Sequence, residues 1–230
     1  RLRELGLIRL HADADEVREQ VAVSTEDGEV VTVSSNDDAA RFNDRIRDER
    51  TRQRLVDDTA TTTGSDGLPV GRGDLIQTRQ NDTALGVANR QQWIVQHVEP
   101  DGSLWAREAH SDRKREHSVH LPAEYVREHA HLSYAATAYG VQGVTVPASH
   151  TILSDVMSGA ALYVGMTRGR EANTLHVIAE NEADARQRFI DAMERDRADR
   201  GLTDATQHAA EAVRGLIDNG PVRLVNTEIA

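Results

Sequence analysis

Apolar and polar positions divide the chain into three parts: two in which strands alternate with helices, and one between them that contains only short strands. Residues 13–25 predict a helix with Asp13 as its N-cap, and a hairpin over 21–34 is the alternative. In either case the β-branched run 30–34 predicts a strand. Asn36 or Asp37 is expected to cap the helix that follows. A strand that leads through a polar turn into a helix is the unit of a parallel α/β sheet.

The middle of the chain has a different pattern. Residues 57–73 are rich in Thr, Gly, Ser and Asp, which predicts a linker. Beyond it, short runs separated by polar turns favour a small antiparallel barrel, with strands expected at 74–78, 92–98, 103–107 and 118–121. Trp93 and Trp105 are expected in its core, with stacking on a nucleobase as the alternative for one of them.

The α/β pattern returns at Ala135. Strands are expected at 151–153 and 174–178, with a helix over 158–167 between them, and two surface helices follow at 183–197 and 203–217. We therefore expect an α/β protein with a parallel sheet, an inserted small antiparallel barrel and a C-terminal helical tail. The expected limits are 1–66 and 132–180 for the two parts of the parallel domain, 67–131 for the barrel and 181–230 for the tail.

The formal net charge of −11 argues against a broad basic surface that coats nucleic acid, but it leaves room for a narrow basic track. Lys114 is the single lysine among 27 basic residues and has no glycine nearby, so the sequence contains no P-loop motif of the Gly-x-x-x-x-Gly-Lys-Ser/Thr type. The sequence has no cysteine, no signal peptide pattern and no apolar run of about 18 residues. We expect a cytoplasmic protein without a membrane partner. Because the chain begins at Arg1, we expect a piece of a longer polypeptide.

Two segments contain the candidate chemistry. In residues 134–146, Gly140 and Gly143 allow the backbone to approach a ligand. Hydroxyl and amide groups suited to phosphate and base contacts come from Thr137, Tyr139 and Gln142. A tight turn packed against a neighbouring strand is the alternative interpretation of this segment.

The second segment, residues 162–171, places Arg168 and Arg170 beside glycines, just past the expected end of a helix. Arginine offers a permanent charge and a planar fork of donors that matches phosphate oxygens. A solvated helix terminus, where cations interact favourably with the helix dipole, is the alternative. The histidines at 117, 120, 129 and 131 have generic spacing and no cysteine partner, so no metal site is expected.

Together and in this order, the two segments resemble motifs V and VI of superfamily 1 helicases, in the RecD-like branch that includes the helicase half of MobF/TraA-type conjugative relaxases. The resemblance covers roughly residues 30–180. Residues 74–82 resemble the start of the small SH3-type barrel that this branch inserts before motif V, and residues 121–126 resemble its end. The chain departs from the family at Tyr139, where many relatives have His, and it lacks the first motor domain with its P-loop and Mg²⁺-binding carboxylates.

The resemblance implies that the chain is the second motor domain of an ATP-dependent DNA helicase, with a RecA-like parallel sheet and an inserted SH3-type barrel. Thr137, Tyr139 and Gln142 would contact single-stranded DNA. Arg168 would be the arginine finger that reaches the γ-phosphate, and Gln142, Gly143 and Arg170 would line the nucleotide site, with Glu171 beside them. ATP and Mg²⁺ would be bound mainly by the N-terminal RecA-like domain of the same polypeptide, so this chain alone is expected to be inactive. The alternatives are a RecD-type exonuclease subunit and a non-catalytic DNA- or protein-binding module.

Overall fold

The structure, a computed structural model, describes residues 7–109 and 117–198 of the 230-residue chain. The predicted helix over 203–217 and the single lysine, Lys114, lie outside these ranges. No helix within them is long and apolar enough to cross a membrane.

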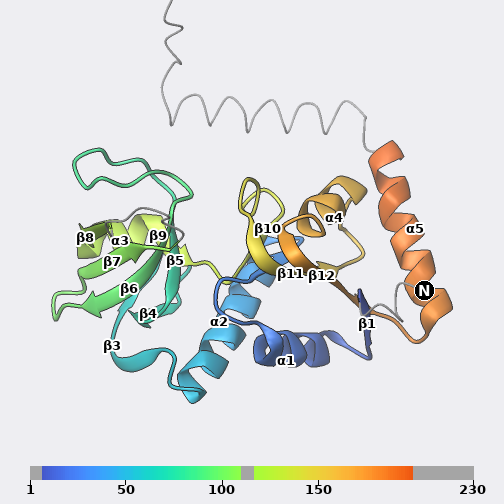
Figure 1. The fold of residues 1–230 in the computed structure, drawn as a ribbon, viewed down its shortest axis with the longest axis horizontal. Helices are drawn as coiled ribbons and strands as arrows, with labels where there is room; N and C mark the ends of the chain where they lie inside the picture. Colours follow the sequence, from blue (N-terminus) through green and yellow to red (C-terminus); the bar gives the residue numbers. More distant parts are fainter. Residues whose placement is uncertain (1–6, 110–116, 199–230) are drawn as a thin grey trace, which may run out of the picture.

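A five-stranded parallel sheet forms the larger unit (Figure 1). Its strands lie in the order β1-β12-β11-β2-β10, and every pairing between neighbours is parallel. Their bounds are β1 Ile8–His11, β2 Val30–Val33, β10 Ala135–Thr137, β11 Val146–Leu153 and β12 Gly169–Ile178. Helices α1 (Ala14–Ser24) and α2 (Asn36–Arg52) cover one face, α4 (Gly159–Gly165) lies on the other, and α5 (Glu182–Ala198) packs against α4. The α/β class with a parallel sheet is therefore confirmed.

A smaller antiparallel unit is inserted between α2 and β10. Its main sheet has the order β8-β7-β6-β5-β9, and β3 and β4 form a separate hairpin. The elements are β3 Asp57–Thr63, β4 Pro69–Arg72, β5 Leu75–Thr78, β6 Gln92–Val98, β7 Leu104–Glu108, β8 Ser118–Leu121, α3 Ala123–His129 and β9 Ala130–Leu132. In the described part of the chain, none of these strands pairs with the parallel sheet. An inserted antiparallel unit is thus present, while its SH3-type barrel topology and its expected limits stay predictions.

The predicted linker over 57–73 is wrong, because this segment forms the β3–β4 hairpin. Thr61, Thr62 and Thr63 pair with residues 69–71, and β-branched threonine favours an extended backbone although it is polar. The hairpin turns at Asp66-Gly67, where Gly67 has a φ of 79° and the Asp66 carboxylate accepts a hydrogen bond from the Leu68 N–H at 3.2 Å. The polar composition of this segment indicated a loop, but its β-branched residues and its Asp-Gly turn favour a hairpin.

Side-chain caps fix the starts of the first two helices. The Asp13 carboxylate accepts hydrogen bonds from the N–H groups of Asp15 and Glu16, both at 2.9 Å, which confirms the predicted N-cap and excludes the alternative hairpin. The second helix is capped by Ser35, whose Oγ accepts a hydrogen bond from the Asp38 N–H at 3.1 Å. The prediction of Asn36 or Asp37 as the cap is therefore wrong by one or two residues, since serine caps as well as either of them.

The two tryptophans lie on opposite sides of the antiparallel sheet. Trp93 on β6 is fully buried, as predicted. Trp105 on β7 is 44% exposed and lies against the His120 ring, with 5.0 Å between centroids. Successive side chains of a strand point to opposite faces, and the buried positions on β7 are Leu104 and Ala106. The prediction of a core position for Trp105 is therefore wrong.

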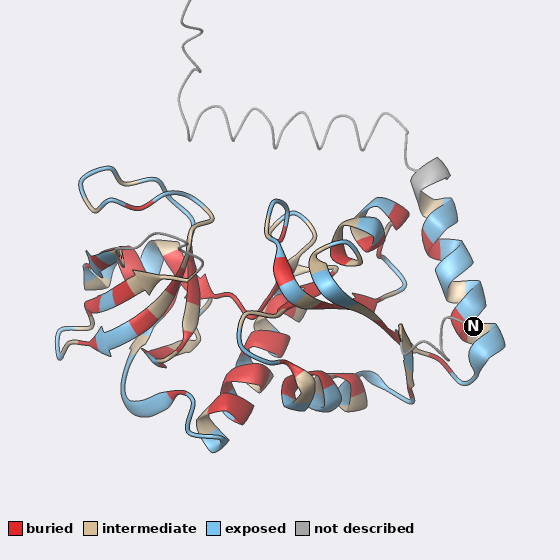
Figure 2. Ribbon diagram, in the orientation of Figure 1, coloured by how far each residue is buried: buried red, intermediate tan, exposed pale blue. Residues whose placement is uncertain are grey.

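Helix α2 contacts both units and is buried along much of its length (Figure 2). The buried Asn43 donates from Nδ2 to the carbonyls of Leu132 (3.0 Å) and Ala135 (3.1 Å) and accepts from the Ala135 N–H (2.7 Å). Leu132 ends β9 and Ala135 begins β10. One asparagine therefore satisfies the backbone at the junction between the antiparallel unit and the parallel sheet.

A buried ion pair adds a second connection. Arg47 on α2 donates from Nε to the Asp74 carboxylate at 2.9 Å, and both side chains are buried. Asp74 also accepts from the Gly71 N–H (2.7 Å) and from the Tyr134 hydroxyl (2.7 Å). Burial and the neighbouring carboxylate raise the pKa of Tyr134, so its hydroxyl stays protonated and donates. The carboxylate is satisfied by three donors, from α2, from β4 and from the turn between β9 and β10, as a buried charge requires.

Candidate functional site

The candidate arginine finger follows helix α4. Ser158 caps this helix, with its Oγ accepting from the Ala161 N–H at 3.2 Å, as the predicted start at 158 implies. The helix ends at Gly165, where a Cβ would lie 2.5 Å from Thr151 Oγ1. Only glycine allows α4 to lie this close to β11. The position of Arg168 is therefore set by direct packing of the helix on the sheet.

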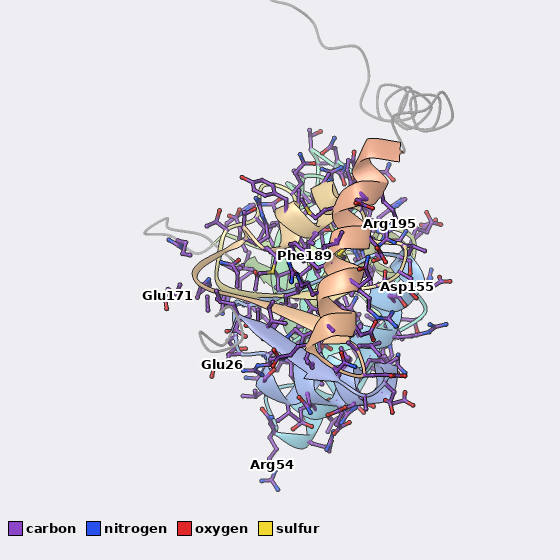
Figure 3. All side chains as sticks on the ribbon, turned by 90° about the vertical axis from the view of Figure 1, so that its right-hand side faces the viewer. Glu26, Arg54, Asp155, Glu171, Phe189 and Arg195 are labelled. Carbon is purple, nitrogen blue, oxygen red and sulfur yellow. The ribbon has the colours of Figure 1, made fainter. Side chains whose placement is uncertain are left out.

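Strand β12 begins at Gly169, five residues before the predicted start at 174. Arg170 and Glu171 consequently lie on an exposed strand, and Figure 3 shows Glu171 projecting from the edge of the molecule. Arg168 and Arg170 both follow the end of α4, as predicted, but the expected strand start at 174 is wrong, so that Arg170 lies within β12. Asn173 fixes this turn: its Oδ1 accepts from the Gly169 N–H (2.9 Å), and its Nδ2 donates to the Gly169 carbonyl (2.8 Å).

The guanidinium of Arg168 is held by acceptors of its own chain. Nε donates to the Val164 carbonyl (2.8 Å), NH1 to the Val144 carbonyl (3.3 Å) and NH2 to Thr167 Oγ1 (3.0 Å). A guanidinium has five N–H groups, so these contacts within the described part of the chain leave two for a ligand. The group is partly exposed, held in one orientation and able to donate to an oxyanion.

These contacts also test the alternative for this segment. The bond to Val164 satisfies a carbonyl in the last turn of α4, so Arg168 does interact favourably with a helix end. It also contacts residues beyond that helix, because NH1 reaches Val144 and the Arg168 carbonyl accepts from the Val146 N–H at 3.1 Å. The structure thus joins the end of the first motif-like segment, at Val144 and Val146, to Arg168 of the second.

The remainder of the first segment forms a turn after β10. Thr137 ends that strand, and its Oγ1 accepts from the Gly140 N–H at 3.3 Å. A Cβ at Gly140 would lie 2.9 Å from Ala136 Cβ, which is the packed turn of the alternative interpretation. Gly143 has a φ of 86°, with no described atom within 4 Å of a Cβ added there. Glycine is therefore needed for packing at one position and for its dihedral angle at the other.

Thr137, the first of the predicted DNA contacts, and the predicted finger lie at opposite ends of the strands of the parallel sheet. Thr137 pairs in register with Val33 at the carboxyl end of β2, whereas Arg168 immediately precedes Gly169, which pairs with Val146 at the amino ends of β12 and β11. Tyr139 (67% exposed) and Gln142 are accessible on the connecting loop. The structure brings Val144 to Arg168 but does not place Thr137 beside it.

One residue near this loop was not predicted. Arg90, between β5 and β6 of the antiparallel unit, places its Cζ 3.9 Å from the centroid of the Tyr139 ring. No signal in the sequence links the two residues, because the contact depends on how the two units are packed. The sequence also gave no indication of the Asn173 contacts with Gly169.

A row of buried histidines crosses the parallel sheet away from Arg168. His11 Nε2 lies 2.9 Å from His176 Nδ1, His176 Nε2 lies 3.0 Å from His150 Nδ1, and His150 Nε2 lies 3.2 Å from the Glu29 carboxylate. Burial lowers the pKa of His176 to about 2 and also lowers that of His11. The hydrogen bond from His150 lowers the pKa of Glu29.

No family model matches the chain. Two curated proteins of Mycobacterium tuberculosis, uncharacterized protein MT2373 (strain CDC 1551 / Oshkosh) and uncharacterized protein Rv2311 (strain ATCC 25618 / H37Rv), are each 34% identical over 91 residues. The match covers 40% of this chain and 51% of either relative, so the chain spans about half the length of the curated relatives it matches.

Solved structures of Pif1 helicases are similar to the chain. Bacteroides Pif1 bound to ssDNA has a TM-score of 0.47 and 15% identity, covering 66% of this chain and 41% of that one. Pif1 helicase from Candida albicans has a TM-score of 0.47 and 11% identity, covering 76% and 52%.

Proposed function

We propose that this chain is the second motor domain of an ATP-dependent translocase or helicase that moves on single-stranded DNA. The observation that carries the proposal is Arg168, which three acceptors hold in place while two of its N–H groups have no partner among the described residues. Its sequence context, Thr167-Arg168-Gly169-Arg170 after an apolar helix, resembles motif VI of superfamily 1 helicases. An arginine held in one orientation at a domain surface can stabilise a phosphoryl group that a partner domain binds on the other side of a cleft.

ATP and Mg²⁺ would be bound by a partner domain that has a P-loop, because the sequence of this chain contains none. In this proposal the partner is the N-terminal RecA-like domain of the same polypeptide. Arg168 would stabilise the charge that develops on the transferred phosphoryl group, a contribution of about 10³–10⁵ in rate for arginine fingers. Arg170, Gln142 and Gly143 would lie near the same nucleotide.

Single-stranded DNA would pass over the loop after β10. Thr137, Tyr139 and Gln142 offer a hydroxyl, an aromatic ring and an amide, and the last two are exposed. With a net charge of −11, a narrow track of this kind fits the chain better than a broad basic surface. Closure and opening of the nucleotide cleft would then move the strand stepwise between the two motor domains.

The finer assignment within this proposal is the helicase half of a conjugative relaxase, with a RecD-type exonuclease subunit as the alternative. One observation favours a second candidate, a DNA- or protein-binding module without ATP hydrolysis: three donors of Arg168 are already used within the chain. In that case the arginine would only stabilise the turn between α4 and β12.

Substitution of Arg168 separates these candidates. In the protein that contains both motor domains, Arg168→Ala and Arg168→Lys are expected to lower ATP turnover by about 10³-fold or more and to leave nucleotide affinity nearly unchanged. A finger acts on the transition state rather than on bound ATP, and lysine lacks the planar fork. The measurements are steady-state ATPase with saturating single-stranded DNA and nucleotide affinity.

Arg170→Ala is the matched control, since it also removes one exposed arginine beside Gly169, and its effect on turnover is expected to be mild. Near-normal turnover in Arg168→Ala, with loss in Arg170→Ala, would move the finger by two residues. If neither variant affects turnover, the motor proposal fails and the binding module remains.

A further inference from the structure

The contact between Arg90 and Tyr139 joins the two units at the exposed loop after β10. Arg90 belongs to the polar turn between β5 and β6, and Tyr139 belongs to the turn that follows β10. The guanidinium carbon lies 3.9 Å from the ring centroid, which is within the range of a cation–π contact. This contact therefore combines a positive charge from the antiparallel unit with an aromatic ring from the parallel unit.

The backbone of Arg90 has an unusual conformation. Its φ is 66°, and within the described ranges Arg54 is the other non-glycine residue with a positive φ. Hydrogen bonds hold this conformation: the Arg90 N–H donates to the Thr78 carbonyl at 2.7 Å, and the Arg90 carbonyl accepts from Gln77 Nε2 at 3.4 Å. A conformation of this kind persists where the surroundings fix it, and such residues gather at functional sites.

Tyr139 remains accessible in spite of this contact. The residue is 67% exposed although the arginine covers one side of its ring. The other side of the ring is therefore open to solvent and can receive a flat partner. Nucleobases stack on such rings largely without regard to sequence, and a guanidinium held at the same place can donate to a phosphate oxygen.

We propose that Arg90 and Tyr139 together bind one nucleotide of single-stranded nucleic acid, with the base on the open face of Tyr139 and the phosphate at Arg90. The proposal rests on the proposed function and deepens it, because it makes the antiparallel unit part of the DNA-binding surface. Arg90 both positions the ring and contributes charge, in a chain whose net charge of −11 otherwise repels DNA.

Photo-crosslinking of the 230-residue chain to a 5-iodouracil-substituted oligonucleotide tests this at low salt. The expected crosslink maps to Tyr139. Arg90→Gly is expected to lower the crosslink yield about fivefold or more, because the nucleotide loses its phosphate contact and the ring loses the arginine that positions it. Glycine adopts a φ of 66° without strain, so this variant is expected to keep the fold. Tyr139→Phe is expected to retain binding of the oligonucleotide, since the ring remains.

Arg54→Gly is the matched control. It removes the same charge at a residue with a φ of 61°, and Figure 3 shows the Arg54 side chain projecting away from the body of the molecule. Its crosslink yield is expected to equal that of the unsubstituted chain. Equal loss in both variants would show a general charge effect and overturn the proposal.

The remaining outcomes distinguish this inference from the proposed function. A Tyr139 crosslink that Arg90→Gly leaves unchanged overturns the role of Arg90 and leaves the DNA motor intact. Crosslinks at Thr137 or Gln142 without Tyr139 overturn the stacking site alone. If no crosslink forms anywhere on the chain, the inference and the DNA-binding part of the proposed function both fail.

Discussion

Asp74 illustrates how one buried side chain supports the arrangement of both units. Asp74→Asn is expected to destabilise the protein by about 3–5 kcal/mol, because it removes the buried one of the two carboxylates that pair with the buried Arg47. Asp58→Asn is the control, since Asp58 also contacts Arg47, at 2.6 Å, but has a side chain that is 54% exposed. It is expected to cost less than about 1 kcal/mol. Urea denaturation measures both, and equal losses would contradict the importance of burial.

Single residues were predictable where local chemistry determines them. Asp13 caps its helix and Trp93 is buried, as the sequence indicates. Ser35 and Trp105 show the limit, because several residue types can cap a helix and a strand has two faces. The contact of Arg90 with Tyr139 could not be predicted, since it depends on the packing of segments far apart in the sequence.

At the scale of elements, a strand was predicted where its own residues favour an extended backbone. A strand that is extended only because it pairs with a neighbouring strand was not predicted. The β-branched residues of β2 identify it without further context. The polar first half of β12, from Gly169 to Thr174, is extended because it pairs with β11. Strand β1 has the same origin, since it adds to the edge of β12. Tertiary pairing of this kind overrides local propensity.

The histidine row is expected to make the stability of the folded protein sensitive to acid. Between pH 6.5 and about 2, the unfolded chain binds a proton at His176 that the folded chain excludes, so stability decreases as pH falls. From pH 7 to pH 5 the expected loss from this residue is about 2 kcal/mol. His176→Gln retains a donor and an acceptor without titrating, and it is expected to reduce the loss. Urea unfolding at the two pH values measures it.

His97→Gln is the control for that experiment, because His97 lies on β6 with a side chain that is 61% exposed and takes no part in the row. Its acid sensitivity is expected to match that of the unsubstituted protein. If His176→Gln loses as much stability as the unsubstituted protein between the two pH values, the acid sensitivity has another source.

At the scale of the whole molecule, the chain is expected to be unable to hydrolyse ATP alone. The sequence has no P-loop to hold the phosphates, and the proposed finger, Arg168, would then have no bound nucleotide to act on. Phosphate release from the purified chain is expected to stay at background with and without single-stranded DNA. A DNA-stimulated rate that survives Arg168→Ala would show that the chain has a nucleotide site of its own.

Binding of single-stranded DNA by the chain alone is expected to be weak and to decrease steeply with salt. Few phosphates can be contacted by a narrow track on a molecule of net charge −11. Titration of a labelled oligonucleotide at two salt concentrations measures this. Tight binding that does not depend on salt would argue against a helicase-type track.

The buried contacts of helix α2 limit how the two units can move relative to each other. Asn43 and Arg47 connect it to the junction at Ala135 and to Asp74, so the antiparallel unit is attached to the sheet by buried contacts as well as by the chain. A hinge between the units would have to break these contacts. The two units are therefore expected to rotate as one body, so that a movement driven at Arg168 in the parallel unit would also carry a nucleotide held at Arg90 in the antiparallel unit, without loss in an internal joint.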